Sequence, residues 1–414
     1  MQGPCEGGSV TRSLTIVGGF YREICRFPPS DEYWGSGGRA AAAIKELAIS
    51  TKLVTAAESL AQPFLAAISQ TVGFSFQSTP IPTTVVFRYD HGLSTPIISP
   101  PIHELERVHL KGCGDCVLQF GMLEADVDVT AKIIIYDPQN PLSPKHFHST
   151  VRPDRLAYVL NATEAKRLGN NNDLMKAIAK VVKDSEADVI VIKRGPRGAL
   201  IWQNEQITTI PAYQVENVWP IGSGDVFAAV FAAKWGIDGI NAVDAARSAS
   251  RATSDYVQTR SLPISREVID EESALPIAQI SDKHFEADTF DVYLAGPFFN
   301  MAQLWLIDEA RAALAGMGLR VFSPYHDIGI GTALEVAPKD ISALKKSRVV
   351  FAILDGVDPG TVFEVGFARA EQKPVIAFAQ CTPEEPLKMV AGTGCEVVAD
   401  FVSAIYKTAW AVWQ

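Results

Sequence analysis

The sequence lacks any apolar run that approaches the roughly 20 residues a membrane-spanning helix needs. Its first ten residues also lack the basic start and the apolar core of a signal peptide. We therefore expect no membrane segment and a cytoplasmic location.

Cysteine is scarce and basic residues are outnumbered. Six cysteines in 414 residues are too few for a disulfide framework. Cys113 and Cys116 form a lone CxxC without a recognisable second pair of zinc ligands, so we expect reduced structural thiols and no metal site. With 37 Lys and Arg against 47 Asp and Glu, the net charge is −10, which argues against a nucleic-acid or anionic-membrane binder. A local pocket for a small phosphorylated ligand remains compatible with this charge.

The remaining composition, 47% hydrophobic and 20% charged, is that of a globular protein with two or three domains. Short β-branched runs alternate with Ala-rich stretches, which indicates an α/β fold with largely parallel sheets. In the first part we expect strands at 14–17, 83–89, 132–136 and 189–193, and helices at 39–48, 228–235 and 242–256. In the second part we expect strands at 291–296, 319–323, 349–354 and 374–378, and helices at 303–317 and around 341. These patterns predict a domain at 1–275, a linker at 276–289 and a smaller doubly wound domain at 290–414.

The first informative motif is Gly222-Ser223-Gly224-Asp225, at the start of an expected helix. Small residues at a helix N-terminus let backbone N–H groups face an anion. An Asp at that point can accept the proton of an attacking hydroxyl while the amides hold a phosphoryl group. Taken alone, the motif is equally compatible with an ordinary helix start.

Companion motifs in the right order make residues 1 to about 275 resemble the PfkB-type, ribokinase-like carbohydrate and nucleoside kinases. The resemblance implies a ribokinase-like fold, ATP and Mg²⁺ as cofactors, Asp225 as the catalytic base and the preceding three residues as an anion hole. It also implies nucleotide-binding roles for Asn161 and Glu164, which match an N-x-x-E element, and for Gly195 and Gly198, which match a G-x-x-G turn.

The sugar side of this motif set departs from the family. Gly37 and Gly38 match the paired glycines beneath the sugar, but Arg39 follows where the family has Asn. Glu23 stands where the family places a sugar-binding Asp. The domain is therefore either a kinase for a different sugar or nucleoside, or a domain that binds a nucleotide without turnover.

The second informative motif runs from Asp358 through Gly360 and Thr361 to Glu364. It follows the expected strand at 349–354, so it lies at the carboxyl end of a sheet, where such folds bind ligands. We expect Thr361 to cap the next helix and Glu364 to lie in its first turn, where the helix dipole keeps a nucleophilic carboxylate ionised. The alternative is a Thr-x-x-Glu capping box without chemistry.

Residues from about 290 to 414 resemble the nucleoside 2-deoxyribosyltransferase family, including its hydrolase relatives. The opening Y-x-A-G-P-F-F motif of that family is matched from Tyr293 through Gly296, Pro297 and Phe298. The resemblance implies that Glu364 attacks the anomeric carbon and forms a glycosyl-enzyme, as in retaining glycosidases.

Three further roles come from the same resemblance. Tyr293 would orient the nucleophile, Asp340 would manage the proton of the departing base, and Asp358 would hold a sugar hydroxyl. Gly360 belongs to the same D-x-G-T element. The resemblance implies no cofactor for this domain and a homo-oligomer, because the family shares its sites between subunits.

The family's N-x-M element is only half present, since Met389 is kept but its Asn is lost. The adjacent Lys388 brings a positive charge that would suit a 5′-phosphate, unless it is simply solvated.

Together the two halves predict a bifunctional enzyme of nucleoside or nucleotide metabolism. It would cleave or transfer an N-glycosidic bond and carry an ATP-dependent sugar or nucleoside kinase. The alternative is a glycosidase regulated by a catalytically degenerate, nucleotide-sensing domain.

Overall fold

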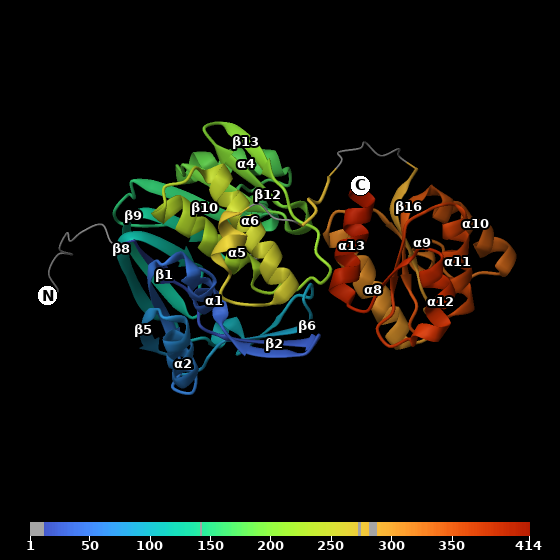
Figure 1. Cartoon of the computed structure of the whole chain (residues 1–414), viewed down its shortest axis with the longest axis horizontal. Helices are drawn as coiled ribbons and strands as arrows, with labels where there is room; N and C mark the ends of the chain where they lie inside the picture. The colour runs from blue at the N-terminus through green and yellow to red at the C-terminus, as the bar shows by residue number, and fades with distance from the viewer. Residues whose placement is uncertain (1–11, 141–142, 272–274, 281–287) are drawn as a thin grey trace. The chain divides into compact units, whose positions relative to one another are not determined.

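The structure is a computed structural model that describes residues 12–140, 143–271, 275–280 and 288–414. It divides into two compact units, residues 1–215 with 219–277 and residues 216–218 with 278–414 (Figure 1). The first ten residues and residues 281–287 of the predicted linker lie outside the described part. No helix in that part is long and apolar enough to cross a membrane.

The first unit is built on a nine-stranded sheet in the order β13-β12-β11-β10-β9-β8-β1-β4-β5. Its strands run parallel from β5 to β11, and β12 and β13 continue it as antiparallel neighbours. The predicted strands at 14–17, 132–136 and 189–193 are confirmed, because buried β-branched runs suit a sheet covered on both faces. The strand bounds are β1 Ser13–Val17, β4 Ser50–Ala57, β5 Ser75–Pro80, β8 Val108–Phe120, β9 Ala125–Asp137, β10 Arg155–Asn161, β11 Val189–Lys193, β12 Ala199–Gln203 and β13 Gln206–Ile210.

Helices cover both faces of this sheet. One apolar core lies beneath α1 (Gly35–Ala43), α5 (Ser223–Phe231) and α6 (Ala242–Thr259), and a second beneath α3 (Ala162–Leu168) and α4 (Leu174–Ser185) (Figure 1). The same unit also contains α2 (Gln62–Val72) and the short helix α7 (Arg266–Asp270).

The predicted helix at 39–48 is wrong at both ends. It begins at Gly35 and ends at Ala43, before a short 3₁₀ turn at Lys45–Leu47. The early start escaped prediction because glycine is normally a poor helix former. Here Gly37 is needed for close packing, since a Cβ on it would lie 2.9 Å from the backbone oxygen of Gly18.

A small four-stranded sheet, in the order β3-β2-β6-β7, accompanies the large one. Its strands are β2 Arg22–Phe27, β3 Ser30–Tyr33, β6 Val86–His91 and β7 Ile97–Ser99. The strand predicted at 83–89 begins three residues later and ends two residues later than expected. This small sheet brings Glu23, on β2, toward α1.

The second unit is a five-stranded, all-parallel sheet in the order β15-β14-β16-β17-β18. This is the flavodoxin-like 2-1-3-4-5 order, and it confirms the predicted doubly wound fold. The strands are β14 Phe290–Ala295, β15 Val321–Phe322, β16 Ser347–Ile353, β17 Val375–Phe378 and β18 Glu396–Val398.

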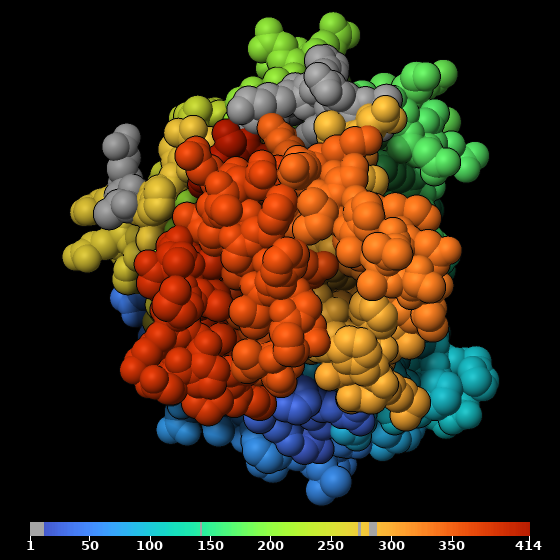
Figure 2. Space-filling view, turned by 90° about the vertical axis from the view of Figure 1, so that its right-hand side faces the viewer, coloured from blue at the N-terminus to red at the C-terminus, as the bar shows by residue number. Residues whose placement is uncertain are grey.

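Helices α8 (Met301–Gly316) and α13 (Phe401–Trp413) cover one face of that sheet. The other face is covered by α10 (Ala333–Lys346) and α11 (Pro359–Ala370), with α12 (Glu384–Gly392) on the same side (Figure 1). A short helix, α9, spans Pro324–Asp327. The surface of this unit is drawn in orange and red in Figure 2, and the central strands β14, β16 and β17 lie almost entirely buried beneath it.

Candidate active sites

The first candidate site lies in the second unit, where the strand order of its five-stranded sheet reverses. The adjacent strands β14 and β16 send the chain away in opposite directions, which leaves a crevice at their carboxyl ends. The loop after β14 begins with Gly296, where a Cβ would lie 2.8 Å from Ile307 and 3.1 Å from Ile353. The absence of a side chain on Gly296 lets both isoleucines pack closely against this turn.

A phenol and a carboxylate meet in this crevice. The hydroxyl of Tyr293, a fully buried residue of β14, donates to Oε1 of Glu364 on α11 at 2.6 Å. The pKa of Glu364 is raised to about 7. Burial raises it most, the tyrosine hydrogen bond lowers it, and the charges of Asp340 and Asp358 raise it. These four side chains, predicted as one site, therefore lie within electrostatic reach of one another.

Two details of the predicted helix start are wrong. Asp358, not Thr361, is the N-cap of α11, and its Oδ2 accepts from the Thr361 amide at 2.7 Å and hydroxyl at 2.9 Å. Glu364 consequently lies in the second turn, where the helix dipole has weakened. Burial therefore dominates, and the pKa of Glu364 is raised where we had expected a readily ionised group. The alternative Thr-x-x-Glu capping box does not form, because Glu364 is bonded to Tyr293.

Asp340 lies on α10, partly buried. Burial raises the pKa of its carboxyl group. Within the described part of the chain, its Oδ1 is a buried atom without a hydrogen-bond partner. A carboxyl group in that condition is suited to holding and releasing a proton.

The remaining residues predicted for this site are more open. Pro297 is buried and Phe298 is half-buried, with its ring 5.4 Å from those of Phe299 and Tyr325. On α12, Met389 is 76% exposed, and Lys388 forms an exposed ion pair with Glu385. A phosphate contact of Lys388 stays a prediction.

The second candidate site lies at the N-terminus of α5 in the first unit. Gly222, with φ of +79°, is the N-cap, and Ser223, Gly224 and Asp225 form the first turn as predicted. A Cβ on Gly222 would lie 2.2 Å from Nε of Arg39, so glycine is required for the close approach of that side chain.

Arg39 occupies the centre of this site. It is 1% exposed, and its Nη1 lies 2.8 Å from Oδ2 of Asp225 while its Nη2 pairs with Oε2 of Glu23. The other oxygen of Asp225 accepts from Nε2 of Gln139 at 2.5 Å. Sequence reasoning noticed the unusual Arg39 but missed these contacts and Gln139 altogether.

A second buried ion pair borders the same turn. Lys193, the last residue of β11, pairs with Asp137, the last residue of β9. A Cβ on Gly224 would lie 3.2 Å from Nζ of Lys193, so the lysine reaches the start of α5. Sequence reasoning missed both groups, although their positions at the carboxyl ends of two predicted strands were a usable signal.

The predicted nucleotide residues have clear structural roles. Asn161 and Glu164 form a reciprocal capping box, with Oδ1 of Asn161 accepting at 2.9 Å and Oε2 of Glu164 accepting at 2.8 Å. Burial, with Asp137 nearby, raises the pKa of Glu164 to about 7.

The predicted glycines also have structural roles. Gly195 and Gly198 turn the chain with φ of +55° and +73°. A Cβ on Gly198 would lie 2.1 Å from the oxygen of Ile210. Gly38, in α1, packs against Phe20.

The donor set at this turn fits a nucleotide phosphate with magnesium. The helix start and Lys193 offer positive potential, and Glu164 and Asp137 supply carboxylates close by. Mg²⁺ held by substrate phosphates takes only one or two protein carboxylates. The described residues contain no cluster of three or more metal-ligating side chains, so a magnesium ion here would need the phosphates.

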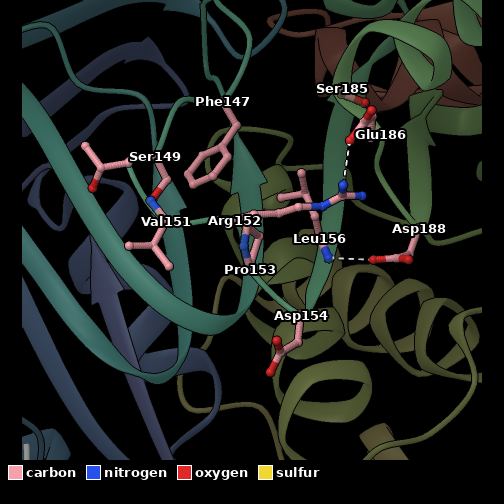
Figure 3. Close-up of a pocket in the computed structure, with 11 residues that line it drawn as sticks. Phe147, Ser149, Val151, Arg152, Pro153, Asp154, Leu156, Ser185, Glu186 and Asp188 are labelled. Carbon is pink, nitrogen blue, oxygen red and sulfur yellow. Dashed lines mark hydrogen bonds and ion pairs between the residues drawn. The ribbon is translucent and has the colours of Figure 1, made fainter.

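A cavity of about 350 Å³ lies elsewhere in the first unit, lined by Phe147, Ser149–Asp154, Leu156, Ser185, Glu186 and Asp188 (Figure 3). It opens at the amino ends of β10 and β11, whereas the candidate site lies at their carboxyl ends. Three of its four charged side chains already have partners: Arg152 pairs with Glu186 at 2.9 Å, and Asp188 accepts from the Leu156 amide at 2.8 Å. It belongs to neither predicted site.

Two family models match the chain, one in each unit. Residues 128–267 match the pfkB family carbohydrate kinase model, and residues 292–397 match the nucleoside 2-deoxyribosyltransferase model. Both resemblances drawn from the sequence are thereby confirmed, and the chain joins a ribokinase-like domain to a deoxyribosyltransferase-like domain. No curated protein matches the chain.

Solved structures of ribokinase-family proteins are similar to the first unit. A pyrophosphate-dependent kinase, solved with a pyrophosphate analogue and myo-inositol, is 14% identical over 62% of this chain and 99% of its own, with a TM-score of 0.45. The ribokinase of Thermotoga maritima is 14% identical over 62% and 98%, with a TM-score of 0.44. A phosphofructokinase-2 mutant of Escherichia coli is 14% identical over 63% and 97%, with a TM-score of 0.42.

Proposed function

We propose that the second unit cleaves or transfers the N-glycosidic bond of a nucleoside, a deoxynucleoside or a 5′-monophosphate of either. The observation that carries this proposal is the 2.6 Å hydrogen bond from Tyr293 to Glu364 at the switch point of the sheet. The match to the deoxyribosyltransferase model over the same residues supports it.

In the proposed reaction a carboxylate oxygen of Glu364 attacks the anomeric carbon, and the bond from that carbon to the base nitrogen breaks. Tyr293 holds the attacking carboxylate in place, and its hydrogen bond favours the ionised form. Asp340, whose pKa is raised by burial, gives its proton to the departing base. Water or a second base then attacks the glycosyl-enzyme, which gives hydrolysis or transfer and releases Glu364.

Substrate contacts follow from the atoms that remain available. Asp358 uses Oδ2 to cap α11, so we assign its Oδ1 to a sugar hydroxyl. Gly360 keeps the turn narrow, because a Cβ there would lie 3.0 Å from Oδ2 of Asp358. We assign Phe298 to the sugar and base side, and Lys388 and Met389 to the 5′ end.

For the first unit we propose ATP-dependent phosphoryl transfer to a sugar or nucleoside. ATP with Mg²⁺ supplies the phosphoryl group, and Asn161, Glu164, Lys193 and the start of α5 hold its phosphate end. Asp225 accepts the proton of the attacking hydroxyl. The match to the pfkB model over residues 128–267, which includes that turn, supports this assignment.

A second candidate for this unit is a nucleotide sensor that does not turn over. It is favoured by the buried ion pair at 2.8 Å between Arg39 and Asp225, since a base that is neutralised by a cation is a weaker proton acceptor. Nucleotide binding would then regulate the glycosidase.

The glycosidase assignment is tested by chromatography of the full chain after incubation with ribo- and deoxynucleosides and their 5′-monophosphates. We expect free base from the wild type and none above background from Glu364→Gln. Base release that survives this substitution would rule out the proposed nucleophile.

The kinase assignment is tested by ADP formation across the same compounds and free sugars, with Asp225→Asn as the control. Nucleotide binding without ADP formation would favour the sensor. Sedimentation of the same preparations tests the expected homo-oligomer.

A further inference from the structure

Arg39 lies between more negative charge than it can neutralise. It is 1% exposed, and its two partners, Glu23 and Asp225, are 7% and 5% exposed. A buried guanidinium must keep an anionic partner, because removing one from a buried pair is strongly destabilising. One carboxylate meets that need here, and the second adds repulsion between two buried anions.

The two carboxylates are not held equally. Asp225 stands on α5, beside the large sheet, and is held by Gln139 as well as by Arg39. Glu23 stands on β2 of the small sheet, and its pKa is raised mainly by burial and further by the charge of Asp225. Glu23 is therefore the less well stabilised partner, and the one that a ligand can replace at lower cost.

The place of Glu23 is also a suitable place for a ligand. Gly222 lets the guanidinium approach the start of α5, and Lys193 reaches the same turn beside Gly224. An anion bound to Arg39 there would lie next to Asp225, the group assigned to accept the acceptor's proton. Among the described residues, Nε of Arg39 is buried without a hydrogen-bond partner, which leaves it one donor for such an anion.

We propose that Arg39 selects an acceptor carrying a phosphate or carboxylate group, and that Glu23 occupies the place of that group in the ligand-free protein. The proposal rests on the phosphoryl-transfer site proposed above. An anionic acceptor replaces the negative charge of Glu23 beside Arg39, whereas a neutral sugar offers the guanidinium only hydroxyl oxygens and no compensating charge.

The reaction is balanced with ATP as the donor. A hydroxyl oxygen of the bound anionic sugar forms a bond to the γ-phosphorus, the bond from that phosphorus to the ADP oxygen breaks, and the hydroxyl proton passes to Asp225. Cleavage of a nucleoside 5′-monophosphate by the second unit would release one acceptor of this class, a pentose 5-phosphate. The class of reaction that supplies the acceptor is then N-glycosidic cleavage of a nucleotide.

The test measures sugar binding by the full chain through calorimetry, with Mg²⁺ and a non-hydrolysable ATP analogue present. The probes are ribose 5-phosphate, 2-deoxyribose 5-phosphate and ribonate, compared with neutral ribose and with inorganic phosphate. We expect the wild type to bind at least one anionic sugar at least tenfold more tightly than ribose and than inorganic phosphate.

Two variants test the predicted roles of Arg39 and Glu23, and a third serves as the control. Arg39→Gln should remove the preference for anionic sugars. Glu23→Gln should tighten their binding at least threefold, because the competing carboxylate is gone. Glu32→Gln, the matched control on β3 directly opposite Glu23 and paired with Arg260, should leave binding unchanged.

Several outcomes would overturn the selection. These are equal binding of ribose, no binding of any sugar, inorganic phosphate binding as tightly as the anionic sugars, or weaker anionic binding in Glu23→Gln. The last result would make Glu23 a ligand of sugar hydroxyls. If Arg39→Gln does not fold, Glu23→Gln alone decides, since its predicted effect is a gain.

Failure of the proposed phosphoryl transfer is distinguishable from failure of the selection. If anionic sugars bind through Arg39 without forming ADP, the kinase assignment is wrong, but the proposed class of ligand is supported. ADP formed equally well from neutral sugars would keep the kinase and remove the role of Arg39.

Discussion

The two units each present a buried carboxylate for chemistry, but they hold it in different ways. Glu364 is held by the neutral hydroxyl of Tyr293, at 2.6 Å, with two further carboxylates nearby. Asp225 is held by the guanidinium of Arg39, at 2.8 Å. A neutral donor orients a carboxylate and leaves its charge to the substrate, whereas a cation already satisfies that charge. The Glu364 site is ready for a neutral substrate. In the Asp225 site, Arg39 must first exchange Glu23 for an anionic group of the substrate.

The largest expected effect follows from removing the carboxylate that has a neutral partner. Glu364→Gln should lower base release at least about 1,000-fold, because no covalent intermediate can form. Steady-state release of free base, measured by chromatography, checks this. Glu371→Gln, an exposed carboxylate just after α11, serves as the control and should retain activity. A loss of less than tenfold in Glu364→Gln would show that another group attacks the sugar.

Removing the cation from the other carboxylate should instead cost stability. Arg39→Ala leaves Glu23 and Asp225 buried without the cation that pairs with both, so we expect the free energy of unfolding of the first unit to fall by about 3–5 kcal/mol. Urea unfolding checks this. Adding Glu23→Gln to the variant should recover part of the loss, and failure to recover any would mean that the two carboxylates do not repel each other.

Tyr293→Phe tests the neutral partner. The tyrosine hydrogen bond lowers the pKa of Glu364, so its loss should raise that pKa above the present value of about 7. In the wild type, kcat/KM should fall as the pH drops below about 7, because the nucleophile must be ionised.

In Tyr293→Phe the fall should begin at a higher pH, and activity at pH 7 should be about 10- to 100-fold lower. The pH profile of kcat/KM separates this effect from a purely structural one. An unchanged profile with a lower plateau would show that Tyr293 supports only the position of Glu364.

The same pKa sets how stability depends on pH. A carboxyl group whose pKa is raised on folding holds its proton more tightly in the folded protein, so the stability it contributes is present at low pH. That contribution is lost as the pH rises from about 4.5, the unfolded value, through about 7. Glu364→Gln should therefore stabilise the second unit at pH 8 by about 3 kcal/mol and hardly at all at pH 4. Thermal unfolding at the two pH values checks the sign.

The sequence predicted regular elements well where burial decides them. The strand at 189–193 was predicted at its observed bounds, because five consecutive residues with β-branched or long side chains suit a covered sheet. The early start of α1 was not predictable from propensity, since it depends on the close packing of Gly37 against Gly18.

The site residues also divide into those that local sequence patterns indicate and those that depend on long-range contacts. The prediction placed the helix cap at Thr361, whereas the structure places it at Asp358, although Pro359 at the first helical position signals a cap at 358. The partners of Arg39 lie 16 and 186 residues away in sequence. Local patterns contain no information on such a contact, so only the fold could show that the unusual residue neutralises the expected base.

The smallest expected effect concerns Lys388, which lies next to Met389 in the incomplete N-x-M element. Lys388 is exposed and paired with Glu385 on the same helix, so a phosphate would have to compete with that ion pair. Exposed pairs of this kind contribute less than about 1 kcal/mol to stability. A phosphate can therefore displace Glu385 from Lys388 at little cost in free energy. We therefore expect Lys388→Gln to raise KM for 5′-monophosphates about two- to fivefold and to leave KM for nucleosides unchanged. Glu385→Gln should lower KM for monophosphates slightly. Equal effects on both substrate types would place Lys388 outside the site and assign the 5′ end to other residues.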